Sequence, residues 1–151
     1  MNKVLCNCIF LIFVLTSNLV KANIDDYFKY DVTSSSSNYG NTGLMEIPNA
    51  RFMSPASLRI NFSASYPFEY TSLTATPFKW FEATYRYAEI KNQKYGPAFY
   101  SGNQSLKDKG FDIKFGLRDE KSFFPAVALG LRDIGGTGLL SSEYLVFTKR
   151  I

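Results

Sequence analysis

The sequence is poor in the residues that most often carry enzyme chemistry. It has no histidine, and its two cysteines, Cys6 and Cys8, lie close to the N-terminus. The absence of histidine excludes a catalytic triad that depends on it. Once the N-terminal residues are removed, as argued below, a cysteine nucleophile, a disulfide and a conventional zinc site are excluded as well. We therefore expect neither a metal nor another cofactor.

The chain also lacks a strong charge of either sign and a sustained helical pattern. It has 17 basic and 13 acidic residues; without Lys3 and Lys21, which lie in the N-terminal leader, the counts are 15 and 13, a surplus of +2. So small a surplus argues against binding to nucleic acid. No stretch shows apolar residues repeating every 3.6 positions, so helix should be a minor component.

The first 22 residues have the pattern of a cleavable secretory signal. Lys3 supplies a basic start, residues 9–15 form an unbroken apolar run, and Val20 and Ala22 provide small residues before the expected cut. The apolar run is too short to span a membrane. The two cysteines lack a lipobox context, so a lipoprotein is not expected. We predict a signal peptide over 1–22, which leaves 129 residues without cysteine.

Aromatic residues are the one class present in excess. The chain has 14 Phe, 10 Tyr and 1 Trp, together 17% of its residues. Soluble domains rarely need so many, whereas membrane β-barrels use them in a lipid-facing band and in girdles at both interfaces. Aromatic stripes of this kind can also form the core of a soluble β-sandwich or stack on sugar rings. We favour the girdle interpretation.

Apolar and polar residues alternate with a period of two over several short stretches, which predicts β-strands. In the clearest case, Phe111, Ile113, Phe115 and Leu117 alternate with more polar residues. Tight turns or polar loops separate the stretches, and the longest loop is expected over 91–108. The fold class is therefore all-β, an antiparallel meander of about six or seven strands. The expected strands are 58–65, 69–76, 80–90, 111–118, 126–132 and 143–150, with 43–47 as a seventh if it pairs.

The order of long and short connections suggests how this meander would lie in a membrane. The connections 66–68, 91–108 and 133–141 would lie at one end of the sheet, and the shorter 77–79 and 119–124 at the other. Outer-membrane barrels place long loops outside the cell and short turns in the periplasm. We therefore divide the mature chain into a polar N-terminal tail, 23–39, and a partial β-barrel domain, 40–151.

Charged residues on the polar faces of the strands are the candidate site residues. They are predicted to line a polar lumen or to contact carbohydrate, so Lys114→Ala should be tolerated. Pairs of carboxylates can catalyse glycoside hydrolysis, but lumen-lining charges are the favoured interpretation, and we do not expect an enzyme. The glycines of 135–138 favour a turn over a phosphate loop, because no lysine follows them. The candidate residues are Glu82, Arg86, Asp112, Lys114 and Arg118.

Long stretches of the chain resemble the YjbH family of bacterial outer-membrane proteins associated with exopolysaccharide. The most specific is LGLRDIGGTGLLSSEYLV, residues 129–146; the segments YGNTGLMEIPNARFMSPASLRINFS and PFKWFEATYRYAEI fit the start of that family. The resemblance covers 39–151 and implies a non-enzymatic β-barrel protein of Gram-negative bacteria. It also implies a role in exopolysaccharide or capsule biosynthesis or export. Expected partners are outer-membrane lipid, polysaccharide and proteins of the export system.

The alternative function is that of a soluble periplasmic β-sandwich binding a ligand or a protein partner. In the favoured interpretation, six or seven strands fall short of the eight found in the smallest single-chain bacterial barrels. An open sheet edge in lipid would leave backbone groups without hydrogen bonds. We therefore expect that the chain is a truncated or split product, an N-terminal portion of a longer family member, or that other copies of the chain or a second polypeptide complete the barrel.

Overall fold

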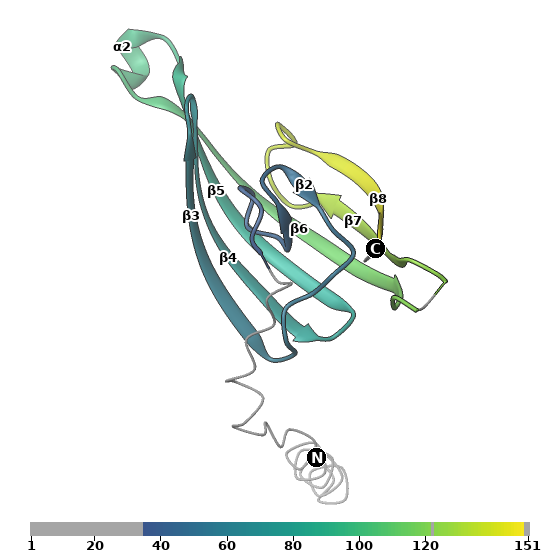
Figure 1. The fold of residues 1–151 in the computed structure, drawn as a ribbon. Coiled ribbons are helices and arrows are strands. Elements are labelled where there is room, and N and C mark those ends of the chain that lie inside the picture. The colour runs from purple at the N-terminus through teal and green to yellow at the C-terminus, as the bar shows by residue number, and fades with distance from the viewer. Residues whose placement is uncertain (1–34, 122, 150–151) are drawn as a thin grey trace, which may run out of the picture. The chain divides into compact units, whose positions relative to one another are not determined.

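The computed structural model describes residues 35–121 and 123–149, and the predicted signal peptide lies outside this range. Its main feature is a six-stranded sheet in which each strand pairs antiparallel with the next along the chain (Figure 1). The expected all-β antiparallel meander is therefore confirmed. The strands are β3 (Ser57–Ser65), β4 (Phe68–Phe78), β5 (Phe81–Lys94), β6 (Ser105–Arg118), β7 (Ala126–Arg132) and β8 (Ser142–Thr148).

The hairpin of β5 and β6 is longer than the sequence predicts. The expected loop over 91–108 is wrong at both ends, since β5 continues to Lys94 and β6 begins at Ser105. A four-residue helix, α2 (Ala98–Ser101), lies at the tip of this hairpin (Figure 1). The sequence did not show the extension because residues 91–94 are all exposed and polar, so they carry no alternation.

The predicted seventh strand is not part of the main sheet. Residues 43–47 contribute instead to a separate two-stranded hairpin made of β1 (Gly43–Leu44) and β2 (Ile47–Pro48). Met45 has a positive φ of 48°, and the chain reverses there after two residues of strand. Such a turn leaves too short a strand to extend a six-stranded sheet.

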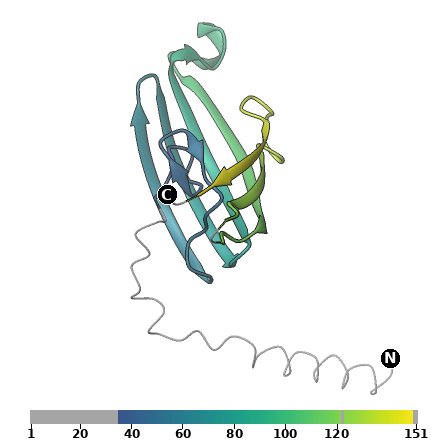
Figure 2. The same ribbon diagram turned by 45° about the vertical axis from the view of Figure 1, so that its right-hand side comes forward.

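The sheet is open within the described residues. β3 pairs only with β4, and β8 pairs only with β7, so each has one edge without a neighbouring strand in this part of the chain. The sheet curves, and hairpin β1–β2 lies on one side of it (Figure 1, Figure 2). Among the described residues, no helix combines the length and the apolar character needed to span a bilayer.

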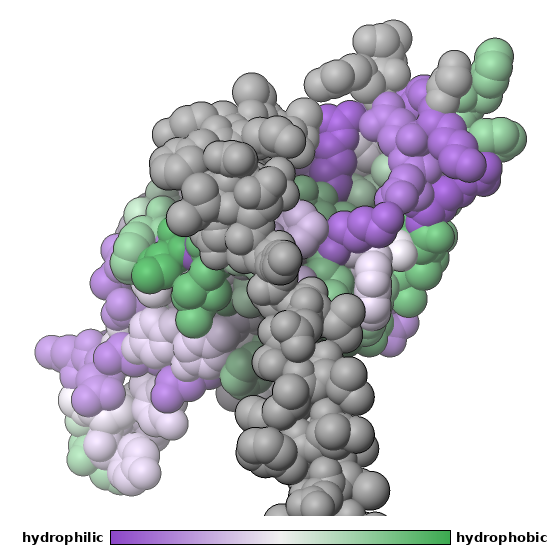
Figure 3. All heavy atoms as spheres, turned by 90° about the horizontal axis from the view of Figure 1, so that it is seen from below, coloured by the Kyte–Doolittle hydropathy of each residue, from purple (hydrophilic) through white to green (hydrophobic). Residues whose placement is uncertain are grey.

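Strand register places apolar side chains in rows on one face of the sheet. Ile60 pairs with Leu73, Leu73 with Tyr85, and Tyr85 with Phe111, a row that crosses four strands. These side chains remain open to the surroundings, and green hydrophobic residues reach the surface in several places in the view from below (Figure 3). We call this the apolar face. Its exposed large residues include Leu58, Ile60, Phe62, Leu73, Phe111, Leu145 and Phe147.

The opposite face is polar and buried, which is the reverse of a sheet in a soluble domain. The row from Arg59 through Thr74 and Thr84 to Asp112 crosses it, and Glu82 pairs directly with Lys114. We call this the polar face. Within the described part of the chain, the cluster of buried apolar residues is small: Ala50, Ala126 and Ala128, with Phe52 and Val146 packed against them.

Candidate functional site

The candidate site is the polar face together with the segment that covers it. Residues 36–53, called the capping segment below, include hairpin β1–β2 and lie on this side of the sheet (Figure 1, Figure 2). Two bridges, Ser36–Thr42 and Ser37–Met45, hold the segment together. Most strand side chains of the polar face are buried, and those of β3 are half-buried. The strand residues that are fully buried on this face are Ser72, Thr74, Thr76, Glu82, Thr84, Arg86, Asp108 and Lys114.

A buried ion pair lies where the capping segment contacts the polar face of the sheet. Lys114 Nζ is 3.0 Å from Glu82 Oε1, and the two side chains are 1% and 0% exposed. Thr42 donates to the same carboxylate twice, from its N–H at 2.9 Å and its hydroxyl at 2.5 Å. Lys114 Nζ in turn donates to the carbonyls of Thr42 (3.2 Å) and Arg51 (2.9 Å). Every charge of the pair is thus compensated by the partner and by the capping segment.

A second buried ion pair lies closer to the long-loop end of the sheet. Arg86 Nη1 is 3.2 Å from Asp112 Oδ2, with side chains 0% and 5% exposed. Asp112 also accepts from the backbone N–H of Asp133 at 2.9 Å, which fixes the start of the β7–β8 connection. The ring of Tyr39 contacts two guanidinium groups, 5.5 Å from that of Arg86 and 4.2 Å from that of Arg132. Here cation–π contacts supplement the ion pair.

The remaining contacts show that the sheet holds the capping segment mainly by its backbone. The Gly40 carbonyl accepts from Thr74 Oγ1 at 2.8 Å and from Arg59 Nη2 at 2.9 Å. The Ala50 N–H donates to Thr148 Oγ1 at 2.8 Å. Gly40 has a φ of 97°, and a Cβ there would lie 1.9 Å from Ser72 Oγ, so only glycine allows this close approach.

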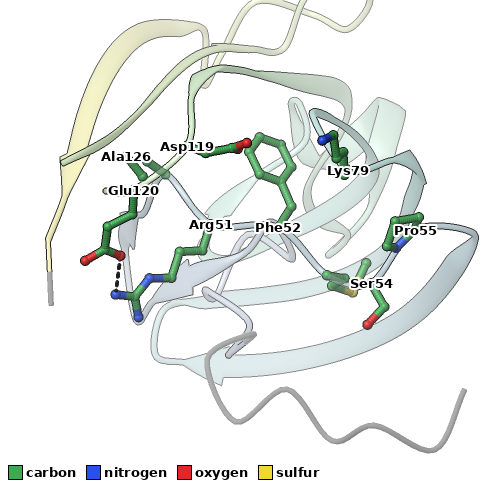
Figure 4. A pocket seen from close by; sticks show the side chains of 10 residues that line it. Arg51, Phe52, Ser54, Pro55, Lys79, Asp119, Glu120 and Ala126 are labelled. Carbon is green, nitrogen blue, oxygen red and sulfur yellow. Dashed lines mark hydrogen bonds and ion pairs between the residues drawn. The ribbon is translucent and has the colours of Figure 1, made fainter. Parts of the chain in front are cut away.

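A pocket of about 330 Å³ opens where the capping segment leaves the sheet (Figure 4). Its wall combines residues 50–55 with Lys79, Asp119 and Glu120. Arg51 and Glu120 form an ion pair across it at 3.2 Å, which ties the capping segment to the β6–β7 connection. Within the described residues, no group of three or more acidic, histidine or cysteine side chains is placed to hold a metal ion.

Four of the five predicted site residues meet under the capping segment, and the fifth does not. Glu82, Lys114, Arg86 and Asp112 form the two buried ion pairs, whereas Arg118 is exposed. A bulge between Gly116 and Arg118 shifts the register, so that Arg118 pairs with Val127 and stacks on the Phe124 ring at 4.0 Å. The period of two is broken at this bulge, and a pattern-based assignment therefore fails beyond it.

The four residues are not free to contact a ligand, because the capping segment occupies the space in front of them. The burial of this pair argues against the expectation that Lys114→Ala is tolerated, since the substitution would leave Glu82 buried without its ion-pair partner. Sequence reasoning also missed Tyr39, Gly40 and Thr42 as contact residues. Their role depends on backbone groups and a ring, and the only signal was the cluster of glycine and small polar residues around 40–43.

Comparison with known proteins gives two matches. A sequence model of the family described as "YjbH: Exopolysaccharide biosynthesis protein YbjH" matches residues 35–151. A protein of Escherichia coli (strain K12), "Uncharacterized lipoprotein YjbH", is 36% identical over 140 residues, which make up 92% of this chain and 20% of the relative. The chain thus spans about a fifth of the length of that curated relative. No solved structure matches.

Proposed function

The chain belongs to the YjbH family, which is associated with exopolysaccharide biosynthesis, and on this premise we propose that its sheet forms part of the wall of an outer-membrane β-barrel. The apolar face contacts lipid, and the polar face lines the interior. The protein takes part in the biosynthesis or export of an exopolysaccharide without being an enzyme. The relative's name describes it as a lipoprotein, which fits a place in the cell envelope.

The observation that carries the proposal is the inverted polarity of the sheet. Its buried side chains include two ion pairs, whereas leucine, isoleucine and phenylalanine side chains of the opposite face are exposed. A soluble sheet places its apolar side inward, because each fully buried large apolar side chain contributes about 1.5–3 kcal/mol. A transmembrane barrel has the opposite arrangement, apolar outward and polar inward.

Strand lengths agree with this arrangement over the first four strands of the sheet. β3 has 9 residues, β4 has 11, and β5 and β6 have 14 each. A tilted transmembrane strand needs about 9–11 residues. β7 and β8 have 7 residues each, and they continue the apolar face with Leu129 and Leu145.

The capping segment then lies inside the barrel as a plug. Polar groups of a barrel interior need hydrogen-bond partners, which can be water or protein, and here backbone groups of residues 36–53 supply them. The edges of β3 and β8 that have no neighbouring strand among the described residues require further strands. Lipid offers no hydrogen bonds to an open edge.

Trp80 allows a direct test, because it is the single tryptophan of the sequence and is 48% exposed near the end of the apolar face. The full-length protein is reconstituted in vesicles whose lipids carry bromine either near the headgroup or near the bilayer centre. Bromine quenches tryptophan fluorescence on contact. We expect Trp80 to be quenched more strongly by bromine near the headgroup. In a Trp80→Phe/Leu73→Trp variant, bromine near the centre should quench more strongly, since Leu73 lies in the middle of β4.

A matched control moves the probe to an exposed position away from the apolar face. Phe123 is 91% exposed in the β6–β7 connection, so Trp80→Phe/Phe123→Trp should show little quenching by bromine near the centre. The alternative, a soluble periplasmic β-sandwich, predicts no quenching at any position. It also predicts release of the protein from envelopes by a carbonate wash. Either result would refute the barrel proposal.

A further inference from the structure

We propose that the tip of the β5–β6 hairpin, residues 91–107, is a binding site for acidic polysaccharide. These residues, called the arm below, extend beyond the end of β4, whose last partner on β5 is Ile90. The arm projects away from the rest of the sheet and carries α2 at its tip (Figure 1). The inference rests on the proposed function, since it names the class of polymer and the residues that contact it.

Exposed aromatic rings are the first feature of the arm. Phe99 is 93% exposed, Tyr100 78% and Tyr95 55%, although all three lie within six residues of one another. None of them takes part in a ring–ring contact within the described part of the chain, in contrast to the stacked rings of the apolar face. Rings left open in this way offer flat apolar surfaces of the kind that stack against the C–H faces of sugars.

The charge of the arm selects an acidic polymer. Residues 91–107 contain three lysines and no aspartate or glutamate, whereas the chain as a whole has nearly balanced charge. Lys91 is neutralised, because it lies 3.1 Å from both Glu69 and Glu89. Lys94 and Lys107 are exposed, and neither lies within 4.0 Å of a carboxylate in the described residues. Lys107 lies opposite Glu89 in the β5–β6 pairing, so Lys94 is the lysine available for the carboxylate or phosphate groups of a ligand.

Amide side chains provide the hydrogen bonds that sugar hydroxyls need. The arm carries two asparagines and two glutamines, all exposed, on both sides of the aromatic tip. One of them, Asn103, accepts from Lys94 Nζ at 3.5 Å, so that the cation and an amide lie side by side. Asparagine and glutamine offer a donor and an acceptor each, which suits hydroxyl groups of either orientation. The four residues are Asn92, Gln93, Asn103 and Gln104.

Hydrogen bonds give the tip a defined shape. The Tyr95 N–H donates to the Gln104 carbonyl at 3.0 Å and closes the base of the loop. The Pro97 carbonyl accepts from the N–H groups of Tyr100 (2.9 Å) and Ser101 (3.0 Å). A binding surface that is already ordered loses less conformational entropy when a ligand binds.

Position also favours a polysaccharide over lipid as the occupant. β5 continues four residues beyond Ile90, or about 13 Å at ~3.3 Å per residue, before the loop begins. In the proposed orientation the long-loop end faces outward, and the aromatic tip lies above the membrane interface. The charged residues first expected to contact carbohydrate, such as Glu82 and Lys114, are buried under the capping segment. The arm is accessible without any rearrangement.

The test measures binding of the full-length protein in detergent micelles to alginate oligosaccharides, a defined polyuronate, and to neutral dextran of the same length. We expect alginate to bind and dextran to bind at least tenfold more weakly. Phe99→Ala should weaken alginate binding about tenfold, which corresponds to about 1.4 kcal/mol. Lys94→Gln should weaken it severalfold and make the remaining binding less sensitive to salt.

Phe123→Ala is the matched control, because Phe123 has almost the same exposure as Phe99, 91% against 93%, at the other end of the sheet. It should leave alginate binding unchanged. The inference is overturned if the wild type does not bind alginate, if dextran binds equally well, or if Phe123→Ala and Phe99→Ala have the same effect. It is also overturned if Phe99→Ala reduces binding to vesicles of phosphatidylcholine and phosphatidylglycerol but not to alginate.

Quenching of Trp80 in brominated vesicles, measured on the same preparation, separates the two proposals. Quenched Trp80 without alginate binding refutes the arm site and leaves the barrel proposal intact. Unquenched Trp80 with alginate binding that depends on Phe99 refutes the barrel proposal and leaves the arm as a polysaccharide site.

Discussion

Removing the charge of Lys114 should destabilise the protein far more than removing a surface lysine. Lys114 Nζ lies 3.0 Å from Glu82 Oε1, and the side chains are 1% and 0% exposed. In Lys114→Met, the Glu82 carboxylate stays buried and loses its ion-pair partner, and it retains the two donors of Thr42 and the more distant charge of Arg59. Breaking a buried pair in this way costs about 3–5 kcal/mol. That is a large share of the ~5–15 kcal/mol that stabilises a typical protein.

The same substitution at an exposed ion pair provides the control. Lys149 Nζ lies 3.9 Å from Glu120 Oε1, with side chains 36% and 27% exposed, and such a pair contributes about 0–1 kcal/mol. Lys149→Met should therefore change stability by less than about 1 kcal/mol. The double variant Glu82→Gln/Lys114→Met removes both buried charges. Its cost should fall short of the sum of the two single costs by about 0.5–3 kcal/mol, the usual range for residues in contact.

The measurement is unfolding in urea of the full-length protein in detergent micelles, followed by Trp80 fluorescence and by heat-modifiable gel mobility. Hydrogen exchange at the Thr42 amide reports separately on the capping segment, because this N–H donates to Glu82. In Lys114→Met we expect faster exchange at Thr42. Equal effects of Lys114→Met and Lys149→Met, or additive costs in the double variant, would show that the pair does not hold the capping segment to the sheet.

Two further substitutions test the faces of the sheet. Ile113→Arg places a charge on the apolar face beside Ala83 and Leu131. It should impair assembly into vesicles, at a cost of about 2–4 kcal/mol at the bilayer midplane. Normal folding into vesicles would contradict the proposed lipid-facing assignment. Gly130→Ala places a Cβ 2.0 Å from the Tyr144 ring and should cost about 1–3 kcal/mol in urea unfolding, because that ring must move away from Asn41. In a Tyr144→Ala background, Gly130→Ala should cause no further loss of stability. The same cost in both backgrounds would show that the added Cβ clashes with a group other than the Tyr144 ring.

The strands and their faces were predictable from sequence because both follow from a period of two. Asp112 and Lys114 were expected opposite Phe111 and Ile113, and the structure buries the two charged residues on the polar face. What the pattern could not show is that this face is closed. The contact with the capping segment uses backbone groups of residues such as Gly40 and Thr42, and hydrogen bonds to backbone leave no periodic trace in a sequence.

The errors of sequence reasoning have physical causes of the same kind. Arg118 was assigned to the polar face because the alternation was extended through a bulge that inserts one residue. Residues 91–94 were predicted as loop because all four are polar and exposed. A strand with water on both faces shows no alternation of apolar and polar residues. Residues 35–39, expected to belong to a polar tail, include Ser37 and Tyr39 of the capping segment. Ser37 donates to Asn41 of the same segment, and the Tyr39 ring contacts the guanidinium groups of Arg86 and Arg132.

The capping segment and the apolar face together constrain what surrounds the sheet. Seven leucine, isoleucine and phenylalanine side chains of this face are still 41–76% exposed, and covering them would contribute roughly 6–12 kcal/mol at 1.5–3 kcal/mol per full side chain. A contribution of that size equals the whole stability of many proteins. The capping segment leaves this face uncovered and binds the polar face, where hydrogen bonds contribute only about 0.5–1.5 kcal/mol each. This imbalance supports the proposed lipid-facing assignment, in which a bilayer covers the apolar face along β3 to β6.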